Sequence, residues 1–239
     1  MGILKVTIFQ KSLENGLNLS VFKKLASVKS DFMIFPEYFC VDSTVSSFDE
    51  IHGKSTFALD WLLKLSDSYR GILIGGSMIL EEDGVRFNAC PVVYQGEVID
   101  WYRKRHLDDY ENGFVNSGSE PGIFILKGHR FAILLNNDMN QAAYLQELAD
   151  MEIRLIFVAM NSSLRKESTD DKLARDQEMF IEPASKFNMS IVKCCSTGSL
   201  LGRSLQGRSL VATPSGVSWR VAFQEEEKEI LKTVMVNVP

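Results

Sequence analysis

The chain has 239 residues, of which 26 are Lys or Arg and 31 are Asp or Glu, so its formal net charge is −5. This acidic balance argues against a nucleic-acid-binding protein, because surfaces that neutralise phosphates need a surplus of Lys and Arg. Hydrophobic residues make up 45% and charged residues 24% of the chain, a composition that excludes intrinsic disorder. No apolar stretch of the sequence approaches the length of a membrane span, so we expect no membrane partner.

Short apolar runs rich in β-branched residues alternate along the chain with stretches of helical period. Strands are predicted at residues 4–10, 31–36, 71–78, 87–94, 97–103, 129–136, 153–160, 189–195, 209–214, 218–223 and 230–236. Helices are predicted at residues 17–28, 56–69, 141–149 and 170–187, with a bend or interruption of the last one at Pro183. No Pro-, Gly- or Ser-rich linker breaks this pattern. We therefore predict one domain over residues 1–239, built as a layered α/β sandwich.

Three local patterns have a structural interpretation only. Gln95-Gly96 separates two predicted strands and is typical of a hairpin turn. Residues 166–172 predict the start of a helix, with either Ser168 or Thr169 as its N-cap. The acidic run at residues 225–229 is expected to form the solvated tip of a hairpin.

Four cysteines occur without the spacing of a disulfide framework or a zinc site, and the three histidines lie apart from them. The cysteines are Cys40, Cys90, Cys194 and Cys195. Such usage indicates a reducing compartment, and we expect a cytoplasmic protein. Neither a metal ion nor another cofactor is predicted.

Polar residues follow three of the apolar predicted strands. Glu37 follows the run MIFP, Lys104 follows IDWYR, and residues 136–138 follow FAILL. A carboxylate placed directly after an apolar strand is partly desolvated, which raises its pKa and suits it to act as a general base. A lysine beside it would balance its charge and could stabilise an oxyanion. Each residue taken singly has a plain alternative as a solvated strand end.

Five short motifs, in order along the chain, give these residues a further meaning. They are Phe35-Pro36-Glu37, then Gly75-Gly76-Ser77 with Phe87-Asn88, then Tyr102-Arg103-Lys104-Arg105-His106-Leu107, then Glu111 with Phe114, and finally Gly207-Arg208-Ser209 with Pro214-Ser215-Gly216. In this order and spacing the sequence resembles the nitrilase superfamily of carbon–nitrogen hydrolases from residue 4 to residue 238. The resemblance implies a four-layer α-β-β-α sandwich and a homodimer.

The resemblance also assigns site residues. Glu37 takes the place of the family's catalytic glutamate, Lys104 that of its lysine, and Glu111 that of a second glutamate that positions the lysine or the substrate. The family nucleophile is a cysteine two residues before an aspartate, and Asp138 matches that aspartate. Asn136 therefore occupies the position of the cysteine.

Asn136 changes the chemistry that the resemblance implies. In the family mechanism the glutamate takes the thiol proton, the thiolate attacks an amide or nitrile carbon, and the lysine and a backbone N–H (here that of Asn137) hold the negative charge. A carboxamide nitrogen has a delocalised lone pair, and Glu37 cannot convert it into a nucleophile. Other departures are Met139 to Ala143 after the aspartate, Ala184 to Phe187 in a late helix, and Cys195 in place of a family asparagine.

Three hypotheses follow. In the first, the chain has lost amide hydrolysis and binds a small amide or carbonyl compound, as a binding or interaction subunit. In the second, it is an active hydrolase or transferase, either because Asn136 is an introduced substitution or because Cys40 or Cys195 supplies the thiol. In the third, it has a purely structural role in a larger assembly. The substrate would be set by the loops at residues 38–49 and 161–169.

Overall fold

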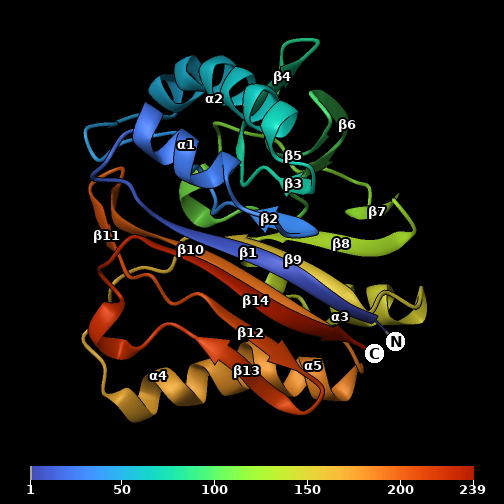
Figure 1. The fold of residues 1–239 in the computed structure, drawn as a ribbon. Coiled ribbons are helices and arrows are strands. Elements are labelled where there is room, and N and C mark those ends of the chain that lie inside the picture. Colours follow the sequence, from blue (N-terminus) through green and yellow to red (C-terminus); the bar gives the residue numbers. More distant parts are fainter. Residues whose placement is uncertain (1) are drawn as a thin grey trace.

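Two groups of strands, each covered by helices on its outer face, make up the computed structural model, which describes residues 2–239 (Figure 1). The first half of the chain contains β1 (Gly2–Ser12), α1 (Leu19–Ala26), β2 (Phe32–Ile34), α2 (Phe48–Ser68), β3 (Ile72–Ile74), β4 (Met78–Glu82), β5 (Val85–Tyr94), β6 (Glu97–Arg103) and β7 (Ile123–Leu126). The second half contains β8 (His129–Leu135), α3 (Ala142–Asp150), β9 (Leu155–Met160), α4 (Thr169–Asp176), α5 (Glu182–Lys186), β10 (Ser190–Leu200), β11 (Arg203–Leu205), β12 (Leu210–Thr213), β13 (Gly216–Arg220) and β14 (Ile230–Val238).

The strands form two sheets that meet at one corner. In the first sheet β1 lies between β14 and β2, followed by β3 and β5, with β4 and β6 paired to β5. In the second sheet the order is β7-β8-β9-β10-β12-β13. The two sheets join where Lys11 and Ser12 of β1 pair with Ser196 and Thr197 of β10.

Alternating side chains of the central strands enter different apolar layers. Phe32 and Ile34 of β2 lie in the layer between the two sheets, whereas Met33 faces α1 and α2. In β9, Phe157 lies between the sheets and Val158 faces α3 and α5. A strand with apolar residues on both faces must be covered on both sides. The three layers therefore confirm the predicted α-β-β-α sandwich.

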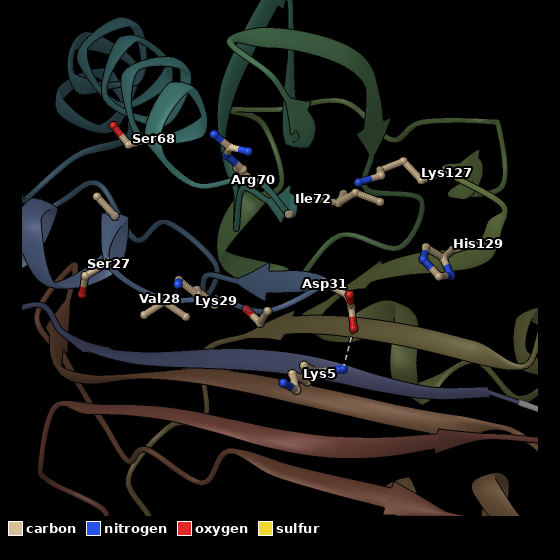
Figure 2. Close-up of a pocket in the computed structure, with 13 residues that line it drawn as sticks. Lys5, Ser27, Val28, Lys29, Asp31, Ser68, Arg70, Ile72, Lys127 and His129 are labelled. Atoms are coloured by element: carbon tan, nitrogen blue, oxygen red, sulfur yellow. Dashed lines mark hydrogen bonds between the residues drawn. The ribbon is translucent and has the colours of Figure 1, made fainter.

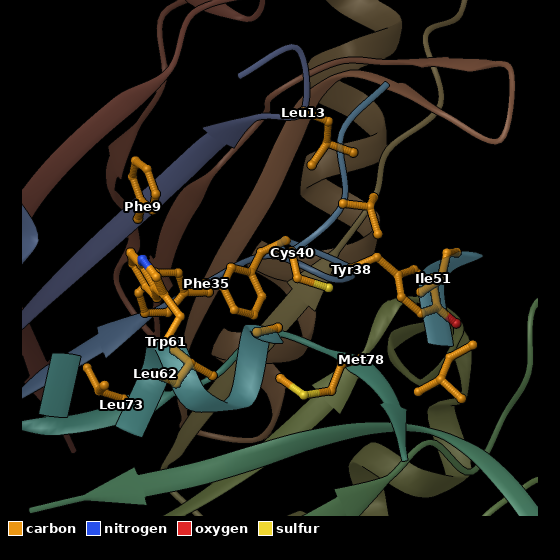
Figure 3. Packing of buried hydrophobic residues seen from close by; sticks show 14 of the residues in the cluster. Phe9, Leu13, Phe35, Tyr38, Cys40, Ile51, Trp61, Leu62, Leu73 and Met78 are labelled. Atoms are coloured by element: carbon orange, nitrogen blue, oxygen red, sulfur yellow. The ribbon is translucent and has the colours of Figure 1, made fainter. Parts of the chain in front are cut away.

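Local sequence signals explain where the long helix α2 begins and how it packs. The Ser47 side chain caps its first turn by accepting the backbone N–H of Glu50 at 3.2 Å. Its buried face includes Trp61 and Leu62, which pack against Phe35 and neighbouring residues of the first sheet (Figure 3). The helix begins eight residues before the predicted residue 56, because the cap at Ser47 precedes the strongly apolar segment.

The prediction of a single strand at residues 71–78 is wrong. The chain forms β3 and β4, with a turn between them at Gly75 and Gly76. Gly76 has a φ of +67°, and a Cβ at this position would lie 2.2 Å from the carbonyl oxygen of Pro36. Only glycine allows so close an approach of two backbone segments. This turn therefore packs directly beneath the segment that carries Glu37.

The stretch at residues 170–187 is helical but not continuous. It comprises α4, a π-helical turn at Gln177–Ile181, and α5, with Pro183 near the start of α5. Because proline has no N–H, the α-helical hydrogen bond to residue 179 is missing and the interruption falls just before it. Ser168 is the N-cap, since its side chain accepts the backbone N–H of Asp171 at 3.1 Å.

The acidic run at residues 225–229 is not the solvated hairpin tip that the sequence predicts. β13 pairs with β12 and β14 pairs with β1, so the run connects two sheets. Glu226 within it is only 6% exposed and accepts a hydrogen bond from Lys172. The short strands β7 and β11 were not predicted, because four and three residues carry too little periodicity. Within residues 2–239, no helix combines the length and the apolar character needed to cross a membrane.

Shortening a side chain in the layer between the sheets should destabilise the protein strongly. Phe157 is fully buried and its ring contacts those of Phe32 and Phe131, with centroids 4.9 and 5.7 Å away. We expect Phe157→Ala to lower the free energy of unfolding by about 3–5 kcal/mol in denaturant titrations. The matched control, Phe57→Ala on the exposed face of α2, should cost about 0.5 kcal/mol or less. Equal losses would contradict the layered core.

Candidate functional site

Polar side chains gather at one end of the two sheets, where several strands terminate. Glu37 follows β2, Lys104 follows β6, Asn136 follows β8 and Asn161 follows β9. A hydrogen bond joins two of these ends, since the Asn161 side chain donates to the backbone carbonyl oxygen of Glu37 at 3.0 Å. Residues that are distant in the sequence are thus neighbours at this edge.

A buried ammonium group forms the centre of this cluster. Lys104 Nζ donates to Glu37 Oε1 at 2.9 Å and to Glu111 Oε2 at 2.7 Å, and it also contacts Asp108 Oδ2. Lys104, Glu37 and Glu111 are fully buried, whereas the Asp108 side chain is 18% exposed. The structure therefore brings together the glutamate, the lysine and the second glutamate that the sequence analysis singled out.

Two further side chains hold the carboxylates in place. The Asn88 amide nitrogen donates to both Glu37 Oε1, at 2.8 Å, and Glu111 Oε1, at 2.6 Å. The Tyr38 hydroxyl donates to Glu111 Oε1 at 2.7 Å. The sequence analysis includes Asn88 in the motif Phe87-Asn88 but assigns it no role. Asp108 and Tyr38 were missed, although the spacing of Asp108, four residues after Lys104, is a weak signal for a pair.

Burial and mutual charge set the protonation of the cluster. Burial raises the pKa of Glu37 to about 8, with Lys104 opposing the shift and Glu111 and Asp108 adding to it. Burial lowers the pKa of Lys104, but the attraction of Glu37 and Glu111 outweighs it, and the pKa lies well above the ordinary value. The lysine therefore stays charged at neutral pH, and Glu37 holds its proton to a higher pH than an exposed glutamate does.

The same three acidic side chains have the spacing of metal ligands. Oxygens of Glu37, Asp108 and Glu111 lie within 4.8 Å of one another, as a cation site would require. Lys104 Nζ, however, contacts all three groups and supplies the positive charge there. A metal ion would have to displace a buried ammonium group, so the donor set does not fit one.

Asn136 lies on a tight turn between β8 and a short 3₁₀ helix. Its φ is +38°, in the region that asparagine tolerates better than most residues. Asp138 fixes the turn, because its carboxylate accepts the Leu135 N–H at 2.9 Å and the Tyr102 hydroxyl at 2.7 Å. The Asn136 side chain donates to Asp108 Oδ2 at 2.7 Å. Asn136 is therefore a hydrogen-bond donor on the solvent side of the buried cluster.

A cavity of about 800 Å³ opens in front of Asn136. Its polar wall includes Asn136, Asp108 and Asn161, and its apolar wall includes Met139, Met160, Met179 and Leu205. Arg165, Arg175 and Arg203 lie around it. Of the two loops expected to define a pocket, the 161–169 loop lines this cavity through residues 161–163 and Arg165, and no described residue of the 38–49 loop does.

Neither candidate cysteine stands in this cavity. Cys40 packs among Phe35, Tyr38 and other residues of the layer beneath α2 (Figure 3). It is 8% exposed, and burial raises the pKa of its thiol to about 12. Cys195 is fully buried in the layer between the second sheet and the helices, with its Sγ 3.7 Å from Ser162 Oγ. A thiol needs a low pKa and access to act as a nucleophile, and Cys40 has neither.

Comparisons with known proteins add relatives of two kinds. No family model matches the sequence. A 2-oxoglutaramate amidase of Bacillus subtilis (strain 168) is 23% identical over 214 residues, which cover 87% of this chain and 80% of the relative. A glutamine-dependent NAD(+) synthetase of Acinetobacter baylyi is 21% identical over 202 residues, and the chain spans only 36% of its length.

Solved structures share the fold along the whole chain. The Nit3 protein of Saccharomyces cerevisiae, a member of branch 10 of the nitrilase superfamily, matches 98% of this chain and 89% of its own at a TM-score of 0.78, with 17% identity. A mutant of the Nesterenkonia AN1 amidase matches 98% of this chain and 90% of its own at 0.81, with 16% identity. A glutamine-dependent NAD+ synthetase from Acinetobacter baumannii reaches 0.82 with 21% identity over 99% of this chain and 46% of its own.

The raised pKa of Glu37 should make stability depend on pH. Below its ordinary pKa of 4.5 the side chain is protonated in both the folded and the unfolded chain. Between 4.5 and about 8 only the unfolded chain releases the proton, so the free energy of unfolding falls as pH rises, by up to about 1.4 kcal/mol per unit. Glu37→Gln should flatten this fall in denaturant titrations, whereas Glu97→Gln at an exposed site should not. A variant curve that follows the wild type would refute the assignment.

Proposed function

We propose that this chain, which belongs to the nitrilase superfamily of carbon–nitrogen hydrolases, binds a small amide or related carbonyl compound without hydrolysing it. The observation that carries the proposal is Asn136, at the position that the resemblance assigns to the nucleophilic cysteine, with its side chain bonded to Asp108. A carboxamide at this place can donate and accept hydrogen bonds but cannot form an acyl intermediate.

The hydrogen bonds around Asn136 support a binding role. The Asp108 carboxylate accepts hydrogen bonds from both Asn136 and Lys104. The amide of Asn136 is thus one of its two side-chain donors. Asn136 cannot deliver a proton to Glu37 and then attack a carbonyl carbon, as a thiol would. The cavity therefore offers hydrogen-bonding groups, among them the Asn136 side chain on the turn after β8, but no nucleophile at that position.

An orphaned polar atom indicates what the ligand would supply. Within residues 2–239, the buried Asn161 Oδ1 lacks a hydrogen-bond partner, and Asn161 lines the cavity. Buried polar groups without partners are rare and costly. A primary amide carries an N–H donor for this oxygen. An amide ligand in the cavity would therefore satisfy the side chain of Asn161.

The charges at the cavity extend this proposal to amides that also carry a carboxylate. The Arg203 guanidinium carbon lies 3.4 Å from the centroid of the Tyr110 ring, and a guanidinium that contacts an aromatic face still has N–H donors for a carboxylate. Arg175 is already engaged by Glu167. The names of two relatives, a 2-oxoglutaramate amidase and a glutamine-dependent synthetase, point to amides with a carboxylate. Assembly as a homodimer and a cytoplasmic location are further predictions of the resemblance.

An active hydrolase is the alternative, and the intact cluster of Glu37, Lys104 and Glu111 favours it. It would need a thiol that reaches the cavity. Cys40 and Cys195 are both buried, so the chain would have to open around one of them. Loss of turnover on changing Cys40 or Cys195 to Ser would establish this alternative.

Catalysis can be tested together with the role of residue 136. We expect the wild-type protein to release no ammonia from a panel of short amides, carbamoyl compounds and nitriles, and to show no acyl adduct by intact mass spectrometry. Asn136→Cys should gain a covalent adduct, because a thiol would stand on the same turn beside Asp108 and Lys104. Asn136→Ala is the control and should gain nothing. Saturable ammonia release by the wild type would refute the binding proposal.

Binding can be tested through Arg203. Calorimetric titration with an amide that carries a carboxylate should give measurable affinity, and Arg203→Ala should weaken it by roughly tenfold or more through the lost charge-assisted hydrogen bond. Arg130→Ala, at an exposed position outside the cavity, should leave the affinity unchanged. An amide without a carboxylate should bind the wild type and Arg203→Ala equally well, because it has no group for Arg203 to bind. Equal weakening by both variants would contradict a role for Arg203.

A further inference from the structure

A second hollow, of about 740 Å³, lies at the opposite end of the sheets from the candidate site. It opens beside the starts of β2 and β3, whereas Glu37 follows the end of β2. Four segments that are far apart in the sequence line it: Lys5 on β1, residues 26–31 after α1, residues 68–72 after α2, and the turn between β7 and β8.

The hollow is lined by cations that lack acidic partners. Figure 2 shows Arg70 and Lys127 on one side of it and Lys5 and Lys29 on the other. None of the ion pairs within residues 2–239 includes any of these four cations.

The net charge of the hollow follows from the charges of its lining residues and of the nearby helix ends. Four cations and the single acid Asp31 give +3, and Asp31 already accepts the backbone N–H of Lys5 at 2.7 Å. The C-terminal ends of α1 and α2 also face the hollow, and each contributes about −0.5. The sum is still about +2. The hollow is therefore positive on a molecule that is negative overall, which favours anions.

Packing contacts shape parts of the hollow. Lys127 Nζ lies 4.9 Å from the centroid of the Tyr94 ring, and the His129 ring packs against Phe32 at a centroid distance of 5.3 Å. The floor at Gly71 is tightly closed, because a Cβ there would lie 2.4 Å from the carbonyl oxygen of Ser30. The cations thus surround a formed depression.

We propose that this hollow binds a small soluble compound through a phosphate group. Cations on two opposite sides suit a group with several negative oxygens, which can accept charge-assisted hydrogen bonds from both sides at once. The volume is that of a site for a small organic ligand. The site is separate from the cavity at Asn136 and does not depend on whether the chain hydrolyses amides.

Calorimetric titration of the full chain with inorganic pyrophosphate tests the proposal. We expect saturable binding that weakens with added salt. The double variant Arg70→Gln/Lys127→Gln removes one charge from each of two segments at exposed positions, and it should weaken binding at least about tenfold. Lys64→Gln/Lys232→Gln removes the same charge outside the hollow and should bind like the wild type.

Three results of the pyrophosphate titrations would overturn the proposal. The first is the absence of pyrophosphate binding at low salt, and the second is equal weakening by the control double variant. The third is weakening by Arg203→Gln in place of Arg70→Gln/Lys127→Gln, which would locate the anion in the other cavity. A phosphate on a lipid headgroup is distinguished with phosphatidylcholine vesicles with and without phosphatidic acid. Binding to the acidic vesicles but not to pyrophosphate would refute a soluble ligand.

Discussion

The ammonium group of Lys104, enclosed by the carboxyl groups of three acidic side chains and fully shielded from water, is the interaction on which the candidate site depends. A buried charge without partners costs several kcal/mol, of the order of 3–5 when one partner of a pair is removed. The ends of β2 and β6 and the turn that carries Asp108 and Glu111 must therefore keep their relative positions. Asn88 adds rigidity, because one amide group bridges Glu37 and Glu111. The electrostatic balance is thus also a geometric constraint on the edge of the first sheet.

This constraint explains how an unusual residue can occupy the turn after β8 without disrupting the site. Asn136 donates to Asp108 Oδ2, the oxygen that Lys104 also contacts, and leaves the buried contacts of Lys104 with Glu37 and Glu111 intact. The cluster needs charge balance to persist, but it does not need a thiol. A protein of this fold can therefore keep the general base, the lysine and the second glutamate for structural reasons. Their presence is weak support for hydrolysis, whereas the residue at position 136 bears directly on it.

The two ends of the sandwich have different character. At the strand ends that carry Glu37 and Asn136, a cavity combines amide groups, buried carboxylates and arginines on its rim. At the other end, the hollow between Arg70 and Lys29 is dominated by unpaired cations. The apolar layer around Phe157 separates the two regions. A ligand at one end can therefore be studied without occupying the other.

The sequence by itself determined the layered architecture and the residues at the strand ends. Runs such as those before Glu37 and Asn136 are apolar at every position, so they had to be strands covered on both faces, with polar residues where burial stops. Only the tertiary structure decided that Asp108 and Asn88 complete the cluster, that Gly76 divides a predicted strand, and that Cys40 is enclosed. It alone brought Lys5, Arg70 and Lys127 around one hollow. These features depend on contacts between segments far apart in the chain. The local hydrophobic pattern indicates which residues are buried, but it does not indicate which other segment packs against them.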